Sequence, residues 1–137
     1  MTLLEWTLAA LLHFAPLEQH DRNPWADPSR EYAQGRYAGI ASAIVSQCET
    51  RSCAALMVAI AVGESGLAKD ADIGPCHRKG AWRSRCDSGH AASVWQAHAY
   101  GVDKAGEKIT LARLFADREL AAWVVLRVAR GSLRQCR

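Results

Sequence analysis

Glu64 is the residue whose position most clearly indicates chemistry. It ends an apolar run, residues 54–62, and Gly66 follows it at a position suited to a left-handed helix cap. The partial negative charge of a helix C-terminus and apolar neighbours such as Met57 and Ile60 would both favour the protonated carboxyl. A carboxylic acid that stays protonated near neutral pH can serve as a general acid. The alternative is a glutamate that points into solvent at the helix end.

The run before Glu64 predicts a buried helix at the centre of the domain. Residues 54–62 carry no polar side chain, whereas a surface helix shows polar residues on one side. The run is too short to cross a bilayer, which takes about 20 residues. We therefore expect an all-α domain built around a central core helix of about residues 54–64.

Further helices are expected where apolar residues repeat every three or four positions. Either Thr50 or Ser52 can cap the central helix, and Asp117 can cap the last helix. Residues 67–90 show no period, and residues 91–99 predict a short helix or turn. The other expected helices span residues 2–14, 30–47, 110–115 and 118–130. The apolar face of the last helix is expected to consist of Leu120, Trp123, Val124 and Val128.

The cysteines favour two local disulfides. Cys48 lies close to Cys53 and Cys76 lies close to Cys86, which leaves Cys136 of the five without a partner in the chain. Two disulfides indicate an oxidising compartment. A zinc site is the competing interpretation, and its spacing matches no standard finger. Its four ligands would be Cys76, His77, Cys86 and His90.

Two segments carry a family resemblance. Glu64-Ser65-Gly66 at the end of an apolar helix resembles the Glu-Ser-x motif of the lysozyme-like superfamily, which includes soluble lytic transglycosylases and goose-type lysozymes. The segment from Gly89 to Gln96, Gly-His-Ala-Ala-Ser-Val-Trp-Gln, is similar to the family's Gly-Ala-x-Gly-Leu-Met-Gln type motif. Ser93 stands where the family has Gly. The resemblance covers roughly residues 30 to 130 and implies the lysozyme-like helical fold.

The resemblance implies that Glu64 is the catalytic acid. Glu64 would protonate a glycosidic oxygen while an oxocarbenium-like state develops. Asp87 is the first candidate for a second carboxylate, and Asp70 and Asp72 are weaker ones. Asp87 could instead cap the turn that follows it.

Other residues are expected to bind the substrate. Ser65 and Gln96 would hold a sugar or Glu64 by hydrogen bonds, and Trp95 would either stack on a sugar or pack in the core. A basic loop over residues 77–85 would either grip carboxylates of the substrate or remain solvated. The expected substrate-binding residues are Ser65, Ser93, Trp95, Gln96 and Tyr100.

The activity implied by the resemblance is cleavage of the β-1,4 bond between N-acetylmuramic acid and N-acetylglucosamine in peptidoglycan, without a cofactor. If water attacks, the enzyme is a lysozyme and needs a second carboxylate or a positioned water. If the muramic 6-hydroxyl attacks, it is a lytic transglycosylase, and Glu64 alone can serve as acid and then base. The alternative is a catalytically inactive lysozyme-like protein that binds the cell wall or has a structural role in a virion.

Length and charge limit the number of domains and the possible partners. The 137 residues suffice for one core, divided here into an N-terminal helix with a proline-containing linker, residues 1–29, and a catalytic domain, residues 30–137. Relatives continue further, so either the chain is truncated at its C-terminus or Cys136 pairs with another chain. A net charge of +3 does not call for nucleic acid as a partner. The N-terminus lacks a basic signal-peptide region, and no membrane span is expected.

Delivery and partners follow from the same features. Disulfides without an export signal point to the periplasm, the cell wall or a phage particle as the place of action. Besides peptidoglycan, a virion protein or another chain could attach through Cys136 or through the N-terminal helix.

Overall fold

The structure is a computed structural model that describes residues 1–20, 27–76, 78–79, 83–84 and 86–136. Helices dominate these ranges, which confirms the all-α class. No helix in them is long and apolar enough to span a membrane. The α-helices are α1 (Leu3–Phe14), α2 (Arg30–Gln47), α3 (Arg51–Ser65), α4 (Lys69–Ile73), α5 (Leu111–Ala116) and α6 (Arg118–Gln135), and the short 3-10 helices are η1 (Leu17–His20) and η2 (Asp87–Gly89).

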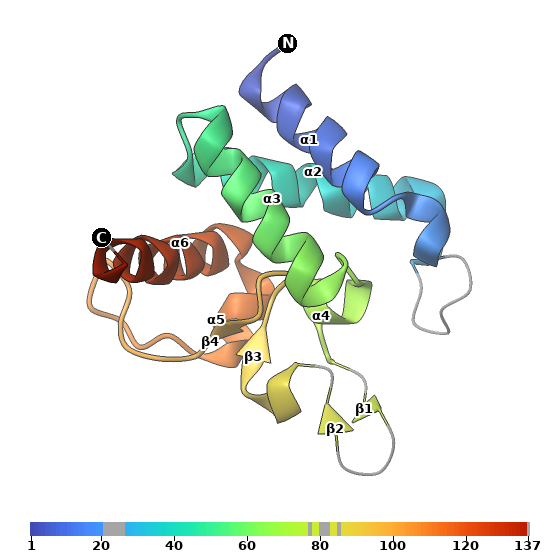
Figure 1. The fold of residues 1–137 in the computed structure, drawn as a ribbon. Helices are drawn as coiled ribbons and strands as arrows, with labels where there is room; N and C mark the ends of the chain where they lie inside the picture. Colours follow the sequence, from blue (N-terminus) through green and yellow to red (C-terminus); the bar gives the residue numbers. More distant parts are fainter. Residues whose placement is uncertain (21–26, 77, 80–82, 85, 137) are drawn as a thin grey trace.

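Helix α3 lies at the centre of the molecule. Figure 1 shows α1 above it, α2 behind it, α6 to the left of its lower half and the strands below it. Helix α1 packs on α2 and α3, and α2 packs on α6. One hydrophobic core joins them, so that Leu11 of α1 shares it with Tyr37 of α2, Met57 of α3 and Leu126 of α6. The N-terminal helix is therefore part of the same packed body as the remaining helices.

The ends of the helices follow the expected capping residues. The Thr50 side chain accepts a hydrogen bond from the Cys53 amide at the start of α3, and Asp117 accepts one from Leu120 at the start of α6. Gly66 ends α3 in the left-handed conformation with φ of 58°. These predictions are confirmed because a cap depends only on residues within one turn of the helix end.

The prediction that α3 is buried on every side is wrong. Ala54, Met57, Val58 and Ala61 are buried, but the side of the helix that carries Ala55, Ala59 and Gly63 is exposed. Alanine and glycine present little apolar surface, so their exposure costs little free energy. A run of small residues therefore does not distinguish a buried helix face from an exposed one.

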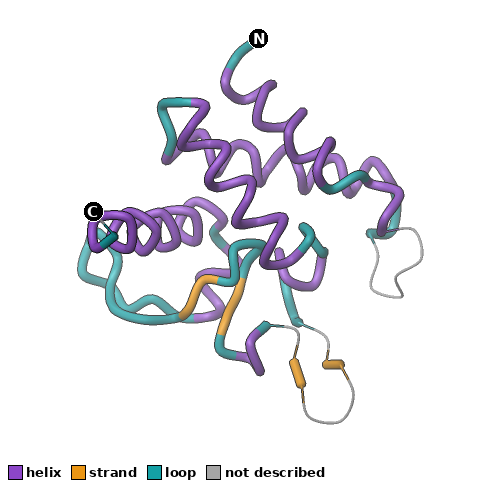
Figure 2. The backbone as a smooth tube through the Cα atoms, in the orientation of Figure 1, coloured by secondary structure: helices purple, strands orange, loops and turns teal. Residues whose placement is uncertain are grey.

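Residues 67–98 hold structure that the sequence did not reveal. The strands β1 (Arg78–Lys79) and β2 (Arg83–Ser84) pair antiparallel, as do β3 (Ala91–Ala92) and β4 (Ala97–His98). Of the short helix or turn expected over residues 91–99, the structure has the turn, at residues 93–96 between the two strands of the second hairpin. Its loop contains Ser93 with φ of 71° and Gln96 with φ of 52°, conformations that non-glycine residues rarely adopt. Figure 2 shows both hairpins in the lower part of the view.

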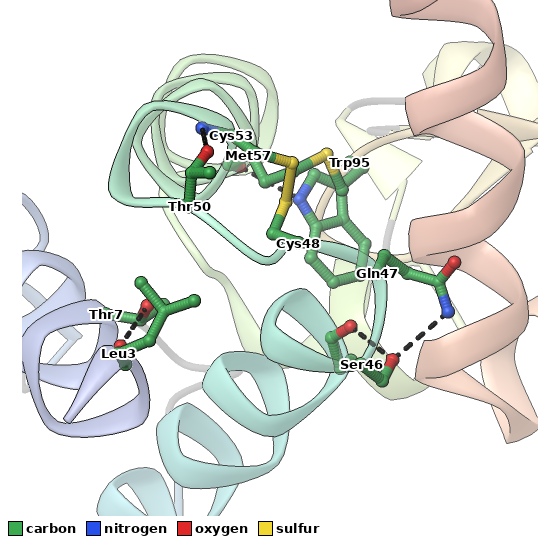
Figure 3. Close-up of a disulfide and its surroundings, with 10 residues drawn as sticks. Leu3, Thr7, Ser46, Gln47, Cys48, Thr50, Cys53, Met57 and Trp95 are labelled. Carbon is green, nitrogen blue, oxygen red and sulfur yellow. Dashed lines mark hydrogen bonds between the residues drawn. A yellow bond between two sulfur atoms is a disulfide. The ribbon is translucent and has the colours of Figure 1, made fainter.

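Two disulfides join the four cysteines that were expected to pair. Cys48–Cys53 closes the turn between α2 and α3, and Cys76–Cys86 joins the end of α4 to η2. Figure 3 shows the first bridge beside Met57 and Trp95. Because Cys76 and Cys86 are bonded to each other, neither can supply the thiolate that the zinc alternative requires. Cys136 is exposed at the end of α6 and remains a thiol.

A buried ion network ties α2, α4 and α6 together. Asp72 is completely buried and accepts hydrogen bonds from Arg36 at 3.0 Å and from Arg118 at 2.9 and 2.8 Å. Arg36 also donates to Asp27 at 2.6 and 2.7 Å and to the Leu67 carbonyl at 3.0 Å. Burial alone would lower the pKa of Arg36, but the bonds to Asp27 and the charge of Asp72 outweigh it, and the pKa is raised. Asp72 is therefore a structural anchor.

Candidate functional site

A cleft lies beside the C-terminal half of α3. Its volume is about 1220 Å³. Helix α3, the segment that follows the β3–β4 loop, and helix α6 each contribute part of the wall. The lining residues used below are Ile60, Glu64, Trp95, Gln96, His98, Tyr100, Asp103, Lys104, Trp123, Val124, Arg127 and Val128.

Glu64 is brought into this cleft by the last turn of α3. Ile60, one turn earlier on the same helix, lines the cleft beside it. The Glu64 side chain is exposed, so the expectation that apolar neighbours remove it from water is wrong. Met57 and Ala61 face the core instead of the carboxylate. The structure matches the alternative, a glutamate that points into solvent at the end of the helix.

Trp95 positions the second motif against α3. The indole is 2% exposed, and its Nε1 donates a hydrogen bond of 3.0 Å to the Met57 carbonyl oxygen. Trp95 is therefore a core residue with one edge at the cleft, which matches the core-packing interpretation. Gln96 follows it into the cleft and donates from Nε2 to the Ser93 carbonyl oxygen at 2.9 Å. Residues 32 positions apart in sequence thus line one cleft, Glu64 from α3 and Gln96 from the β3–β4 loop.

Two expected substrate-binding residues have structural roles instead. Ser93 is completely buried, and its Oγ accepts a hydrogen bond from the Trp95 amide at 3.2 Å. Its φ of 71° lies in the left-handed region that favours glycine, the residue that the lysozyme-like motif has there. Ser65 donates to the Ala61 carbonyl at 3.0 Å and accepts from the Leu67 amide at 3.1 Å, so it completes the end of α3.

The candidates for a second carboxylate do not line the cleft. Asp87 is exposed and lies 3.2 Å from Nε2 of His98, and that histidine does line it. Asp87 is the first residue of η2, and the N-cap position before it is taken by Cys86. Asp72 is held by two arginines, and Asp70 is 3% exposed in α4. The carboxylate that lines the cleft together with Glu64 is Asp103.

Asp103 orders the loop between β4 and α5. Its Oδ1 accepts hydrogen bonds of 2.9 Å from the amides of Ala105 and Glu107, and its Oδ2 pairs with Arg113 of α5. Arg113 also donates to the Lys108 carbonyl at 2.7 Å. The hydrogen bond from Arg113, with those from the two amides, lowers the pKa of Asp103. Asp103 is thus committed to loop structure.

The apolar face expected for the last helix lies between the core, against which Leu120, Trp123 and Val124 pack, and the cleft. Ala121, Ala122 and Leu126 are the buried residues of α6. Trp123 and Val124 are partly buried and Val128 is 65% exposed, and all three line the cleft. The sequence showed the apolar pattern correctly but could not show which of the two apolar faces is covered.

The cleft is also lined by one further expected residue and by three residues that the sequence analysis did not identify as site residues. Tyr100 was expected, and at 87% exposure it stands at the cleft. Lys104 lies on the polar loop, and Trp123 and Arg127 lie on α6. The spacing of four residues between Trp123 and Arg127 was the available signal, because such residues are neighbours on a helix. The basic loop over residues 77–85 contains His77 and Arg85, which lie outside the described residues.

No protein-family model, no curated protein and no solved structure matches this chain. The lysozyme-like resemblance therefore depends on the two sequence motifs alone. Within the described ranges, no group of three or more His, Cys, Asp and Glu side chains is placed to hold a metal ion.

Proposed function

We propose that this protein cleaves the glycan strands of peptidoglycan between N-acetylmuramic acid and N-acetylglucosamine, with Glu64 as the general acid. One observation carries the proposal. Glu64 and Gln96, which come from the two motifs that resemble the lysozyme-like superfamily, line the same cleft of about 1220 Å³. A cleft with apolar walls and a few polar groups is typical of sites that bind small molecules or polymer segments.

In the proposed reaction the carboxyl group of Glu64 donates its proton to the glycosidic oxygen. The bond from muramic C1 to that oxygen breaks, and the N-acetylglucosamine side leaves with a free 4-hydroxyl group. Glu64 is exposed and lines the cleft, so its carboxyl group is within reach of a glycan that enters the cleft.

We propose that the second step is attack by the muramic 6-hydroxyl and not by water. The 6-oxygen bonds to C1, and the Glu64 carboxylate takes the hydroxyl proton, which returns the acid to its initial state. This route needs only one carboxylate. Asp103 is engaged with Arg113 and two amides, and Asp87 is paired with His98 outside the lining. These arrangements favour a lytic transglycosylase over a lysozyme that activates water with a second carboxylate.

The second candidate function is a wall-binding or virion structural protein that keeps the cleft without catalysis. The exposure of Glu64 favours it, because the structure does not enclose this carboxyl group among apolar side chains. In that case the cleft would bind glycan and leave it intact. The two disulfides favour an oxidising compartment, and periplasm, cell wall and phage particle all fit either function.

The test is digestion of purified peptidoglycan with product masses measured by mass spectrometry. The wild type is expected to release products with 1,6-anhydromuramic ends, which are lighter by one water than reducing ends. Glu64→Gln keeps the shape of the side chain and is expected to release none. Reducing ends would replace the transglycosylase by a lysozyme.

Glu49→Gln is the matched control, because Glu49 is an exposed glutamate between α2 and α3 and does not line the cleft. Its digestion products should equal those of the wild type. If the wild type releases no products but sediments with peptidoglycan, the wall-binding alternative holds and the enzyme proposal fails.

A further inference from the structure

Trp123 is contacted by two cations that come from different elements. The guanidinium carbon of Arg127, one turn further along α6, lies 4.5 Å from the centre of the indole ring. The Lys104 Nζ, from the loop before α5, lies 6.0 Å from the same centre. Both distances are within the range of cation–π attraction. All three residues line the cleft that contains Glu64.

In the described part of the chain, neither Arg127 nor Lys104 has a carboxylate partner within 4.0 Å. The nearest acidic residue in sequence to Lys104 is Asp103, and Arg113 already pairs with it. Two positive charges gathered on one ring repel each other, and an anion placed between or beside them would relieve that repulsion. This wall of the cleft therefore favours a negatively charged group.

The position of Lys104 is fixed by the backbone on either side of it. The Asp103 amide donates to the Glu107 carbonyl at 2.9 Å, and the Ile109 amide donates to the Gly101 carbonyl at 3.0 Å. Gly106 turns the loop with φ of 81°. The loop is thus held by its own backbone hydrogen bonds. Only the Lys104 side chain has to be ordered on binding, which limits the entropic cost.

We infer that Lys104, Arg127 and Trp123 form a binding site for a carboxylate carried by the glycan. The inference rests on the proposed function, since it places this carboxylate on the strand whose muramic residue lies beside Glu64. Muramic residues carry a carboxylate either as the free lactyl group or on the attached peptide, whereas an otherwise similar chitin chain is neutral. The cations come from α6 and from the loop, and Glu64 comes from α3, so the carboxylate and the bond to be cleaved would contact different walls of the cleft.

The experiment measures binding in the Glu64→Gln background by isothermal titration calorimetry. The probes are glycan strands with their peptides, the same strands after amidase treatment, and chitohexaose. Lys104→Gln with Arg127→Gln is expected to weaken binding of the first two probes by about fivefold, because both removed charges are exposed and exposed ion pairs contribute modestly to affinity. Chitohexaose should bind with unchanged affinity. The difference should shrink at high salt.

Arg130→Gln is the matched control, because Arg130 is an exposed arginine of α6 that does not line the cleft. It should leave all three affinities unchanged. Stronger binding of peptide-bearing strands would assign the site to peptide carboxylates, and stronger binding of stripped strands would assign it to the lactyl group.

Equal loss for all three probes, or no loss for the charged ones, would overturn the carboxylate site. Cleavage dependent on Glu64 would then still stand on its own digestion test. If no probe binds the Glu64→Gln protein and the wild type releases no products, both the proposed function and this site fail.

Discussion

The indole nitrogen of Trp95 donates a hydrogen bond to the backbone carbonyl oxygen of Met57 at 3.0 Å, across 38 residues of sequence. Met57 lies two helical turns before Glu64, and Trp95 directly precedes Gln96. The bond therefore fixes the distance between the central helix and the β3–β4 loop. It connects the two motifs of the candidate site through the core.

Trp95→Phe is expected to lower the free energy of unfolding by about 1–2 kcal/mol, because it removes this hydrogen bond while most of the aromatic packing remains. Cleavage of peptidoglycan should fall as well, since the loop that carries Gln96 loses its anchor on α3. Chemical denaturation and the digestion assay measure the two effects. Trp6→Phe, on the partly buried Trp6 of α1, should leave digestion unchanged. A stable Trp95→Phe protein with full activity would refute the anchoring role.

Asp72→Asn is expected to destabilise the protein by about 3–5 kcal/mol, because it leaves the buried Arg36 guanidinium without one of its charge partners. The network joins three helices, so a loss of cooperativity is expected along with the loss of stability. Thermal unfolding followed by circular dichroism measures both. Glu18→Gln is the comparison, since its bond to Arg30 joins side chains that are 65% and 57% exposed. That change should cost less than about 1 kcal/mol. Similar effects of both substitutions would contradict the anchor role of Asp72.

Gly39→Ala tests the same network from the side of α2. A Cβ atom at Gly39 would lie 2.6 Å from Nη1 of Arg118, so the guanidinium would have to move away from Asp72. We expect a loss of about 1–3 kcal/mol. Gly35→Ala is the matched substitution one turn earlier, where nothing lies within 4 Å. It should stabilise α2 by up to about 1 kcal/mol, because alanine is the better helix former. If both alanines stabilise the protein, Arg118 moves without cost and the network is weaker than described.

The features that the sequence predicted are those that depend on neighbours along the chain. The helices over residues 30–47 and 118–130, the caps at Thr50 and Asp117, and the disulfides between nearby cysteines need only short-range information. The Asp72 network could not be predicted, because its arginines lie 36 and 46 residues away and a buried aspartate has no local signature.

The candidate site was predicted only in part, because it also depends on contacts between residues that are distant in sequence. Glu64, Gln96 and Tyr100 do line one cleft, but Ser65 and Ser93 belong to backbone structure and Asp87 lies outside the lining. The β3–β4 hairpin escaped prediction because Ser93 and Gln96 hold positive φ without being glycine. Helix α6 has two apolar faces, and only packing decides that Leu126 enters the core while Val128 meets the cleft.

Acid should disorder the loop that carries Lys104. The hydrogen bond from Arg113, followed by those from the amides, lowers the pKa of Asp103 below its ordinary value of 3.8. A lowered pKa in the folded state means that the carboxylate stabilises the loop above pH 3.8 and that this contribution is lost as the pH falls through the lowered value. The amides of Ala105 and Glu107, which donate to Asp103, report on this step through their nitrogen chemical shifts.

We expect both amides to shift together with a midpoint below pH 3.8, and Asp103→Asn to abolish that step. In the variant Lys104 would lose its fixed backbone, so binding of charged glycan strands should weaken at neutral pH while chitohexaose binding changes less. Two amides that titrate separately, or a midpoint above 3.8, would show that the ion pair with Arg113 does not hold the loop in solution. Lys104 would then have to be ordered by the ligand itself, and the affinity for charged strands should be correspondingly lower.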